Sequence, residues 1–264
     1  MGKVIAVANQ KGGVGKTTTT INLGASLAAN DLKVLLIDSD PQGNTTTGVG
    51  ISKNEGKATL YQVLLGEEDI ESAIVPTDFE GLYILPADKN LVAANLELVD
   101  VEERESRLRT RLAPIRERYH FILIDCPPAL DLLTLNAMVT ADSVLIPIQC
   151  EFFALEGISQ LIDTIERVRD SFGSGLTVEG VLLTMYDDRN NLTRQVEQDL
   201  RDFFKEQVFK TVIPRSVRLA EAPSFGKPIL SYDLRSRGAE SYIQLAKEIL
   251  AHEHSTGQTT QSLG

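Results

Sequence analysis

The stretch NQKGGVGKTTTT, residues 9–20, holds the side chains of this sequence that are best suited to bind phosphate. It follows an apolar segment and leads into one of helical period, which is the context that a phosphate-binding loop requires. Its glycines allow backbone amides to turn inward around an anion, and the start of the helix adds its dipole. Lys16 adds a mobile positive charge, Thr17 is placed to coordinate Mg²⁺, and Thr18 is placed to donate to a phosphate oxygen.

The loop departs from the usual pattern G-x-x-x-x-G-K-[ST] in two ways. Gln10 stands where that pattern has its first glycine, and a second lysine, Lys11, stands at the mouth of the loop. One lysine, Lys16, is enough to hold a phosphate. Lys11 therefore either serves something other than the nucleotide of its own loop, or is a solvated surface lysine without a role.

Carboxylates follow two other apolar segments. LLIDSDPQGN carries Asp38 and Asp40, and FILIDCPP carries Asp125 directly after apolar residues, as in a Walker B strand. Hydrolysis of a magnesium nucleotide needs carboxylates that hold the waters of the metal and orient the attacking water. Any one of these aspartates could also be a turn residue or a helix cap. Together with the phosphate loop, they predict a magnesium-nucleotide site in which Thr17 and Asp125 bind Mg²⁺.

Parallel strands are needed to bring these residues together. Short, almost wholly apolar segments alternate along the chain with longer segments of helical period. Strands are expected at residues 3–9, 33–40, 121–128, 143–149 and 178–186, with less regular ones at 82–87 and 210–216. Helices are expected at residues 16–30, 59–66, 104–118, 131–140, 154–171, 192–206 and 237–252. The alternation predicts an α/β fold: a mostly parallel twisted sheet with helices on both faces and binding residues at the carboxyl ends of the strands.

The length fits one large α/β domain or two small ones, and no Pro-, Gly- or Ser-rich linker is long enough to divide the chain. The chain has 264 residues, of which 42% are hydrophobic and 24% are charged. We expect a single domain over residues 1–252 and a disordered polar tail over residues 253–264. No apolar run approaches the ~20 residues that span a membrane, so we expect a cytoplasmic protein with no membrane partner. Cys126 and Cys150 do not form a C-x-x-C pair, which disfavours a zinc or iron–sulfur site.

The charge is unevenly distributed along the chain. The net charge is −11, which by itself disfavours a nucleic-acid partner. Residues 189–247, however, hold 11 Lys and Arg against 7 Asp and Glu, whereas the rest of the chain holds 15 against 30. This surplus forms a basic surface only if the fold gathers these residues on one face.

The loop KGGVGKTT resembles the deviant Walker A loop of the ParA/MinD superfamily of P-loop ATPases. The resemblance implies that Lys11 reaches across a dimer interface to the ATP of the partner subunit. It also implies that Asp38 supports the Mg²⁺ shell and that Asp40 positions the hydrolytic water. Catalysis would be electrostatic and positional, with Lys11, Lys16 and Asp40 as the catalytic residues. Because Lys11 would act in trans, hydrolysis would depend on dimerisation, and turnover of one chain would be slow.

Several branches of this superfamily fit the sequence poorly. A MinD-type membrane ATPase carries a C-terminal amphipathic helix with basic residues on its polar face, whereas this chain ends in HEHSTGQTTQSLG. The flanks of Cys126 and Cys150 do not match the cluster cysteines of a nitrogenase iron protein. A cluster carrier of the Mrp type would need a C-x-x-C pair.

Two later stretches resemble the chromosome- and plasmid-partition branch, ParA/Soj. They are LLTMYDDRNNLTRQV (182–196) and VIPRSVRLAEAPSFGKPI (212–229). The resemblance implies an adenine pocket with Thr184 and Met185 in one wall, and with backbone contacts from Pro214 and Arg215 in the other. The residues expected to contact ATP are Lys11, Gly12, Gly13, Val14, Gly15, Lys16, Thr17, Thr18, Met185, Pro214 and Arg215.

In that branch the ATP-bound dimer binds DNA without sequence preference. Arg189 and Arg218 match positions where the DNA-binding arginines of the family fall, although each basic residue alone could be ordinary solvated surface. The DNA-binding candidates are Arg189, Arg215, Arg218, Lys227, Arg235, Arg237 and Lys247. Nothing resembles a recognition helix, so phosphate contacts should dominate.

The sequence as a whole predicts an ATP-dependent DNA-partitioning ATPase on the nucleoid, with ATP and Mg²⁺ as cofactors. Its expected partners are a second copy of the chain, non-specific double-stranded DNA, and a ParB/Spo0J-type centromere-binding protein that stimulates hydrolysis and release. The alternative is a MinD-like or polar-positioning regulatory ATPase that does not act on DNA. The sequence does not separate a chromosomal from a plasmid origin.

Overall fold

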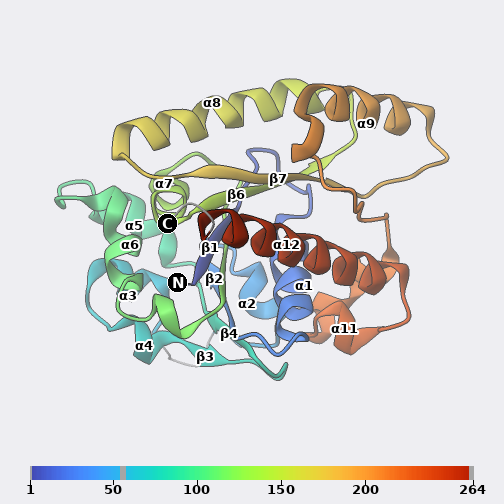
Figure 1. The fold of residues 1–264 in the computed structure, drawn as a ribbon. Helices are drawn as coiled ribbons and strands as arrows, with labels where there is room; N and C mark the ends of the chain where they lie inside the picture. The colour runs from blue at the N-terminus through green and yellow to red at the C-terminus, as the bar shows by residue number, and fades with distance from the viewer. Residues whose placement is uncertain (1, 54–57, 262–264) are drawn as a thin grey trace.

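Seven strands form one sheet, in the order β3-β4-β2-β5-β1-β6-β7, within residues 2–53 and 58–261, which the computed structural model describes (Figure 1). All neighbouring strands are parallel except β3 and β4. The strands are β1 (Lys3–Val7), β2 (Val34–Asp38), β3 (Val75–Pro76), β4 (Leu82–Leu85), β5 (Phe121–Asp125), β6 (Ser143–Gln149) and β7 (Thr177–Thr184). The predicted α/β fold with a mostly parallel sheet is confirmed.

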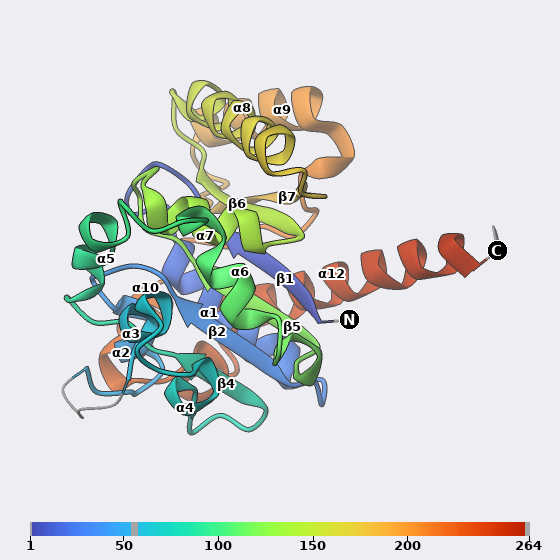
Figure 2. The same cartoon turned by 90° about the vertical axis from the view of Figure 1, so that its left-hand side faces the viewer.

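Helices cover both faces of the sheet (Figures 1 and 2). One face is covered by helices from the two ends of the described chain: α1 (Lys16–Ala28), α10 (Val217–Glu221), α11 (Ile229–Tyr232) and α12 (Arg237–Gln261). The other face is covered by helices from its middle: α3 (Leu60–Leu65), α4 (Ile70–Ala73), α5 (Leu91–Glu97), α6 (Arg107–Leu112), α7 (Leu132–Thr140), α8 (Ala154–Phe172) and α9 (Asn191–Phe204). The short α2 (Asn44–Gly48) contacts α1 and β2. Single 3₁₀ turns complete the described elements: η1 (Arg104–Ser106), η2 (Arg116–Arg118), η3 (Lys205–Gln207) and η4 (Ala222–Phe225).

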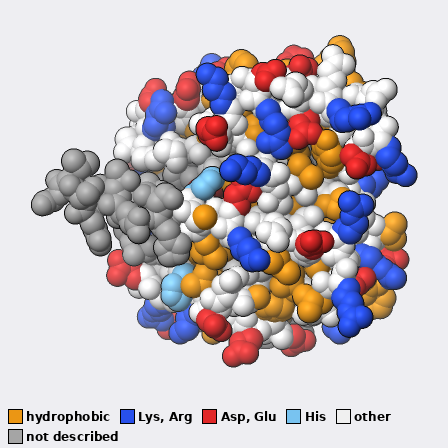
Figure 3. Space-filling view, turned by 45° about the vertical axis from the view of Figure 1, so that its right-hand side comes forward, with side chains coloured by type: hydrophobic (Ala, Val, Ile, Leu, Met, Phe, Trp, Pro, Cys, Tyr) orange, Lys and Arg blue, Asp and Glu red, His pale blue; other side chains and the backbone are white. Residues whose placement is uncertain are grey.

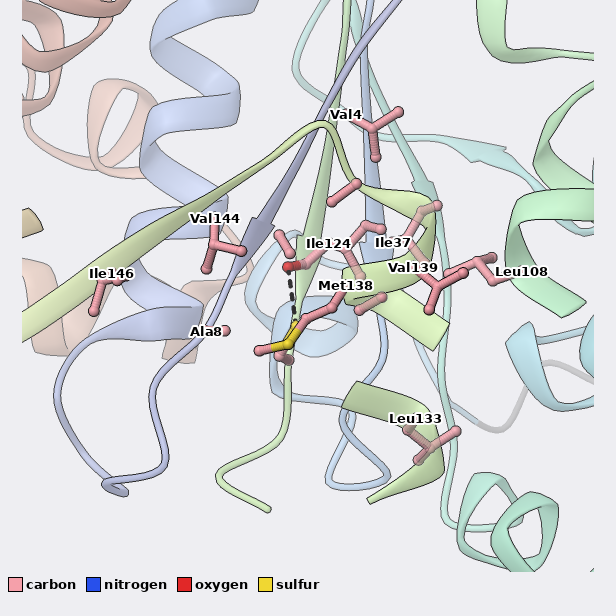
Figure 4. Close-up of a cluster of buried hydrophobic side chains, with 14 of the residues drawn as sticks. Val4, Ala8, Ile37, Leu108, Ile124, Leu133, Met138, Val139, Val144 and Ile146 are labelled. Atoms are coloured by element: carbon pink, nitrogen blue, oxygen red, sulfur yellow. Dashed lines mark hydrogen bonds between the residues drawn. The ribbon is translucent and has the colours of Figure 1, made fainter. Parts of the chain in front are cut away.

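Successive side chains of each strand enter two separate cores. In β5, Ile122 and Ile124 pack under the helices from the middle of the chain, whereas Leu123 packs under α1 and α12. Figure 4 shows part of the first core, where Ile124 lies near Met138 of α7. Burial on both faces explains why the strands read as continuous apolar segments and not as alternating ones.

The strand order brings three strand ends together. β5 lies between β1 and β2. Asp38 at the end of β2 is the register partner of Asp125 at the end of β5, and Val7 at the end of β1 is the other register partner of Asp125. The loop that follows β1 therefore begins beside both carboxylates.

The predicted strand at 210–216 is wrong. Its segment makes an isolated bridge between Pro214 and Tyr186, not a ladder. β7 ends at Thr184, and Met185 then takes a left-handed conformation with φ of 49°, which turns the chain out of line. Pro214 has no N–H to donate to a neighbouring strand, so regular pairing cannot continue.

The predicted helix at 104–118 is also wrong in its extent. The segment forms η1, then α6 over Arg107–Leu112, then η2. Pro114 cannot donate the hydrogen bond that would continue α6, and its ring would clash with the carbonyl four residues earlier. Periodicity alone did not register this break.

The last helix is longer than predicted. α12 continues to Gln261, so residues 253–261 are helical where a disordered tail is predicted, and residues 262–264 lie outside the described part of the chain. Figure 2 shows α12 extending past the sheet towards the C-terminus. Among the described helices, none is both long enough and apolar enough to cross a lipid bilayer.

Candidate functional site

The loop between β1 and α1 forms an open backbone cradle. Gly13 and Gly15 take left-handed conformations, with φ of 76° and 90°, which glycine adopts without strain. Gly15 is also the N-cap of α1, so the unpaired amides of the first helical turn begin at the loop. The hydroxyl of Thr184 donates to the carbonyl of Val14 over 2.8 Å and ties the loop to the end of β7. This is the geometry that binds an anion at a helix N-terminus.

Lys16 lies inside this cradle. Its side chain is buried, and its Nζ donates to the carbonyl of Lys11 over 3.1 Å. Burial lowers the pKa of Lys16 because it disfavours the charged ammonium, and the carboxylate of Asp125 opposes this effect. An ammonium carries three donors, of which this carbonyl uses one. A phosphate in the cradle would take the others and stabilise the charged form.

The two carboxylate oxygens of Asp125 differ in their hydrogen bonds. Its Oδ2 accepts from the hydroxyl of Thr17 over 2.8 Å and from the hydroxyl of Thr45 over 2.7 Å. Its Oδ1 is buried and has no hydrogen-bond donor among the residues that the structure describes. Such an oxygen is costly unless a cation or a cation-bound water lies beside it. The hard oxygens of Thr17 and Asp125 therefore fit Mg²⁺.

The protein alone offers few ligands for this metal. Within the described ranges, no group of three or more His, Cys, Asp or Glu side chains is arranged to hold a metal ion. Water and phosphate oxygens would have to complete the shell, which is the usual arrangement for Mg²⁺ on a nucleotide.

Asp38 and Asp40 differ in burial and in partners. Asp38 is fully buried, and its Oδ2 accepts from the backbone N–H and the hydroxyl of Thr46 over 2.8 and 2.7 Å. Burial raises the pKa of Asp38 to about 6, and burial together with the facing Asp38 raises the pKa of Asp125 to about 7. Asp40 is half-buried, and its Oδ1 accepts from the N–H of Gln42 over 2.9 Å. Asp40 is thus the carboxylate of this group that water reaches most easily.

Lys11 is paired outside its own cradle. Its Nζ forms an ion pair with Glu151, which follows β6. Its backbone N–H donates to the side chain of Asn9 over 2.9 Å. In a single chain, the Lys11 side chain is therefore held at the surface beside the loop, and its role towards a second nucleotide stays a prediction.

The residues predicted to contact adenine meet at one cavity. Met185, Pro214 and Arg215 line a cavity of about 180 Å³ together with Gly15 and Thr18 of the loop. The sharp turn at Met185 directs the chain around this cavity. The fold thus brings segments that are distant in sequence to the position beside the phosphate cradle where a base would lie.

The predicted DNA-binding residues are all exposed but do not form an unbroken basic surface. Arg189 bonds to both carboxylate oxygens of Asp187 at 2.9 Å, and Arg218 pairs with Glu221 at 3.1 Å. Figure 3 shows basic side chains on this side of the molecule with acidic ones between them. A second cavity, of about 700 Å³, is lined by charges of both signs: Arg189, Arg215, Arg237, Asp187, Asp188 and Glu240. Lys227, Arg235 and Lys247 lie outside its lining.

Several side chains that hold the predicted ones in place were not predicted from the sequence. Thr45 and Thr46 bond to the two buried carboxylates, and Glu151 pairs with Lys11. The available signal was the threonine run in NTTTG, directly after the segment of Asp40. Nothing in the sequence pointed to Glu151.

The arrangement of the site defines a class of protein. A glycine-rich loop joins a buried strand to a helix, with Lys16 and Thr17 at the helix start and Asp125 at the end of the adjacent strand. This is the constellation of P-loop nucleoside triphosphatases.

Comparisons with known proteins identify the family within this class. A family model described as an AAA domain matches residues 2–178. Over 253 residues the chain is 54% identical to the chromosome partitioning protein ParA of Caulobacter vibrioides, covering 95% of each. Over 252 residues it is 52% identical to the sporulation initiation inhibitor protein Soj of Bacillus subtilis, covering 96% of this chain and 100% of that one. The solved structure of cobyrinic acid a,c-diamide synthase from Mycobacterium smegmatis, with bound ADP and magnesium, is similar with a TM-score of 0.85, 37% identity and 97% coverage of each chain. The chain belongs to the ParA/Soj family of P-loop ATPases.

Proposed function

We propose that this protein is a DNA-partitioning ATPase that binds ATP with Mg²⁺ and hydrolyses it slowly. The observation that carries the proposal is the meeting of Lys16, Thr17 and Asp125 at one edge of the sheet, where Oδ1 of Asp125 is buried without a hydrogen-bond donor among the described residues. The partitioning role is supported by the names of relatives that are 54% and 52% identical to the chain.

Hydrolysis at this site rests on position and charge and forms no covalent intermediate. Lys16 and the loop amides hold the phosphates, and Mg²⁺, when bound by Thr17, Asp38 and Asp125, supplies charge neutralisation. Asp40 accepts a hydrogen bond from the attacking water and orients it. Lys11 of a second copy supplies the further positive charge that stabilises the transition state.

Lys11 makes dimerisation depend on ATP. In one chain it faces the single carboxylate of Glu151. In a sandwich of two chains, each Lys11 faces the phosphates of the opposite nucleotide, which carry more negative charge than one carboxylate. The dimer therefore forms with ATP and separates after hydrolysis.

The dimer binds DNA through phosphate contacts from residues 189–247. The ion pairs of Arg189 and Arg218 are solvent-exposed, so a DNA phosphate replaces their acidic partners at small cost. One chain offers few such contacts and a two-fold dimer offers twice as many, so DNA binding requires ATP. A ParB/Spo0J-type partner stimulates hydrolysis and releases the protein, which is cytoplasmic and associated with the nucleoid.

A second candidate is a MinD-like or polar-positioning regulatory ATPase that does not act on DNA. The acidic side chains among the basic ones, Asp187, Glu221 and Asp233, favour it because they weaken any positive surface. The chain is less similar to the cobyrinic acid a,c-diamide synthase, at 37% identity, than to the ParA and Soj relatives, at 54% and 52%.

The two candidates are separated by measuring binding to random-sequence DNA with ATP and with ADP, beside flotation with anionic phospholipid vesicles. We expect DNA binding with ATP and no vesicle binding with either nucleotide. The Lys16→Ala variant, which lacks the phosphate-binding ammonium, serves as the control that does not bind nucleotide. Vesicle binding, or DNA binding that ignores the nucleotide, would contradict the partitioning role.

A further inference from the structure

Two neighbouring threonines of α2 hold the two buried carboxylates of the site. The hydroxyl of Thr46 donates to Asp38, and the hydroxyl of Thr45 donates to Asp125. Asp38 and Asp125 are register partners on adjacent strands. One short helix therefore bridges the ends of β2 and β5.

Thr45 makes a contact with a carboxylate of the site, whereas Thr47, the last threonine of α2, makes none. Its side chain is fully buried, and its Oγ1 lies 2.7 Å from Oδ2 of Asp125. Thr17 donates to the same oxygen over 2.8 Å. Oδ2 therefore accepts from two hydroxyls, whereas Oδ1 has no hydrogen-bond donor among the described residues. Thr47, by contrast, is exposed, and its hydroxyl bonds to backbone carbonyls of its own segment, those of Gly43 and Asn44.

We propose that Thr45 is a positioning residue for Mg²⁺, because its hydroxyl fixes the rotation of the Asp125 carboxylate that keeps Oδ1 turned to the water shell of the metal. The proposal rests on the assignment of Thr17 and Asp125 to the Mg²⁺ site. A carboxylate held through one hydroxyl turns about its Cβ–Cγ bond, whereas two donors from different elements fix its plane. Partners that orient a metal ligand change metal affinity by about 10- to 100-fold when they are removed.

The same contact joins the metal site to the segment that carries Asp40. The N–H of Gly43 donates to the carbonyl of Asp40 over 2.8 Å, and Gly43 immediately precedes α2. Gly43 has φ of 61°, and a Cβ there would lie 2.9 Å from the carbonyl oxygen of Ala87. The turn before α2 is therefore tightly packed. Thr45 therefore ties the position of Asp40, through α2, to the carboxylate of Asp125.

The test measures the dissociation rate of a fluorescent ADP from the full chain, once with Mg²⁺ and once with EDTA. We expect Mg²⁺ to slow dissociation from the parent. In Thr45→Val, which keeps the shape and removes the hydroxyl, we expect about tenfold less slowing by Mg²⁺ and an unchanged rate in EDTA. Thr45→Ser, which keeps the hydroxyl, restores the slowing. Thr47→Val, the matched control on the same helix, behaves as the parent.

Asp125→Asn, measured in parallel, tests the assignment of the Mg²⁺ site separately from the role of Thr45. If it keeps the Mg²⁺ dependence of the parent, the metal assignment is wrong, and the role of Thr45 falls with it. If Asp125→Asn loses the dependence and Thr45→Val keeps it, Thr45 alone is refuted. Equal acceleration of Thr45→Val with Mg²⁺ and with EDTA indicates a structural role and also overturns the proposal. Thr45→Ala replaces Thr45→Val if the valine variant does not fold.

Discussion

Replacing Glu151 by glutamine removes the carboxylate that Lys11 faces in a single chain. If Lys11 must leave Glu151 to reach the nucleotide of a second copy, this ion pair opposes dimerisation. The side chains of Lys11 and Glu151 are 53% and 45% exposed, so the pair is screened by solvent. We therefore expect Glu151→Gln to dimerise more tightly with ATP than the parent.

The size of the effect follows from this exposure. A solvent-exposed ion pair contributes about 0.2–1 kcal/mol. A two-fold dimer releases two such pairs, so the gain is about 0.4–2 kcal/mol, which corresponds to a roughly 2- to 30-fold lower dissociation constant of the dimer. Dimerisation without nucleotide should not improve, because Lys11 then has no phosphate to face.

Sedimentation equilibrium with a non-hydrolysable ATP analogue measures this constant. Glu156→Gln is the matched control, because it makes the same change of charge. Glu156 is an exposed residue of α8 and lines the same surface hollow as Lys11. A gain in both variants would mean that net charge is responsible, and not the pair. A weaker dimer in Glu151→Gln would mean that Glu151 contacts the second copy directly, which refutes the reasoning.

The other predictions concern the carboxylates and the basic residues. Asp40→Ala should bind ATP and Mg²⁺ but stop hydrolysing ATP, because no carboxylate then orients the attacking water. The variant should accumulate as a dimer, which light scattering detects. Turnover at the parent rate would show that Asp40 does not orient the water. Burial raises the pKa of Asp125 to about 7, above the ~3.9 of an aspartate in the unfolded chain. Between pH ~3.9 and pH ~7 the folded protein therefore keeps a proton on Asp125 that the unfolded chain has lost. The free energy of unfolding accordingly falls as the pH rises through this range. Asp125→Asn should therefore stabilise the nucleotide-free protein in urea unfolding at pH 8 more than at pH 5, and an equal gain at both pH values would contradict the raised pKa. Arg218→Glu should flatten the dependence of log DNA affinity on log salt by about 2, since each phosphate contact contributes about 0.9 and the change acts twice in a dimer. Arg167→Glu on α8, outside the basic region, should keep the slope of the parent, and an equal slope in Arg218→Glu would move the DNA site elsewhere.

Features that depend on the local order of residues along the chain were predictable without the fold. The run from a buried strand through Gly13 and Gly15 to Lys16 predicted the cradle, because left-handed backbone and a helix N-terminus are encoded by adjacent residues. Apolar segments of strand length predicted the parallel sheet, because strands buried on both faces need apolar side chains on both. An aspartate at the end of such a strand then had to lie at the carboxyl edge.

Which side chains meet at that edge depends on the three-dimensional packing of the chain. Thr45 and Asp125 are 80 residues apart, and Lys11 and Glu151 are 140 residues apart. Such contacts depend on the strand order and on the packing of α2, and neither is encoded in the spacing of the residues themselves. The segment 210–216 has the composition of a strand, but Pro214 and the turn at Met185 prevent a ladder. Local pattern therefore specifies the elements and their ends, whereas hydrogen bonds across the fold specify how each carboxylate is held.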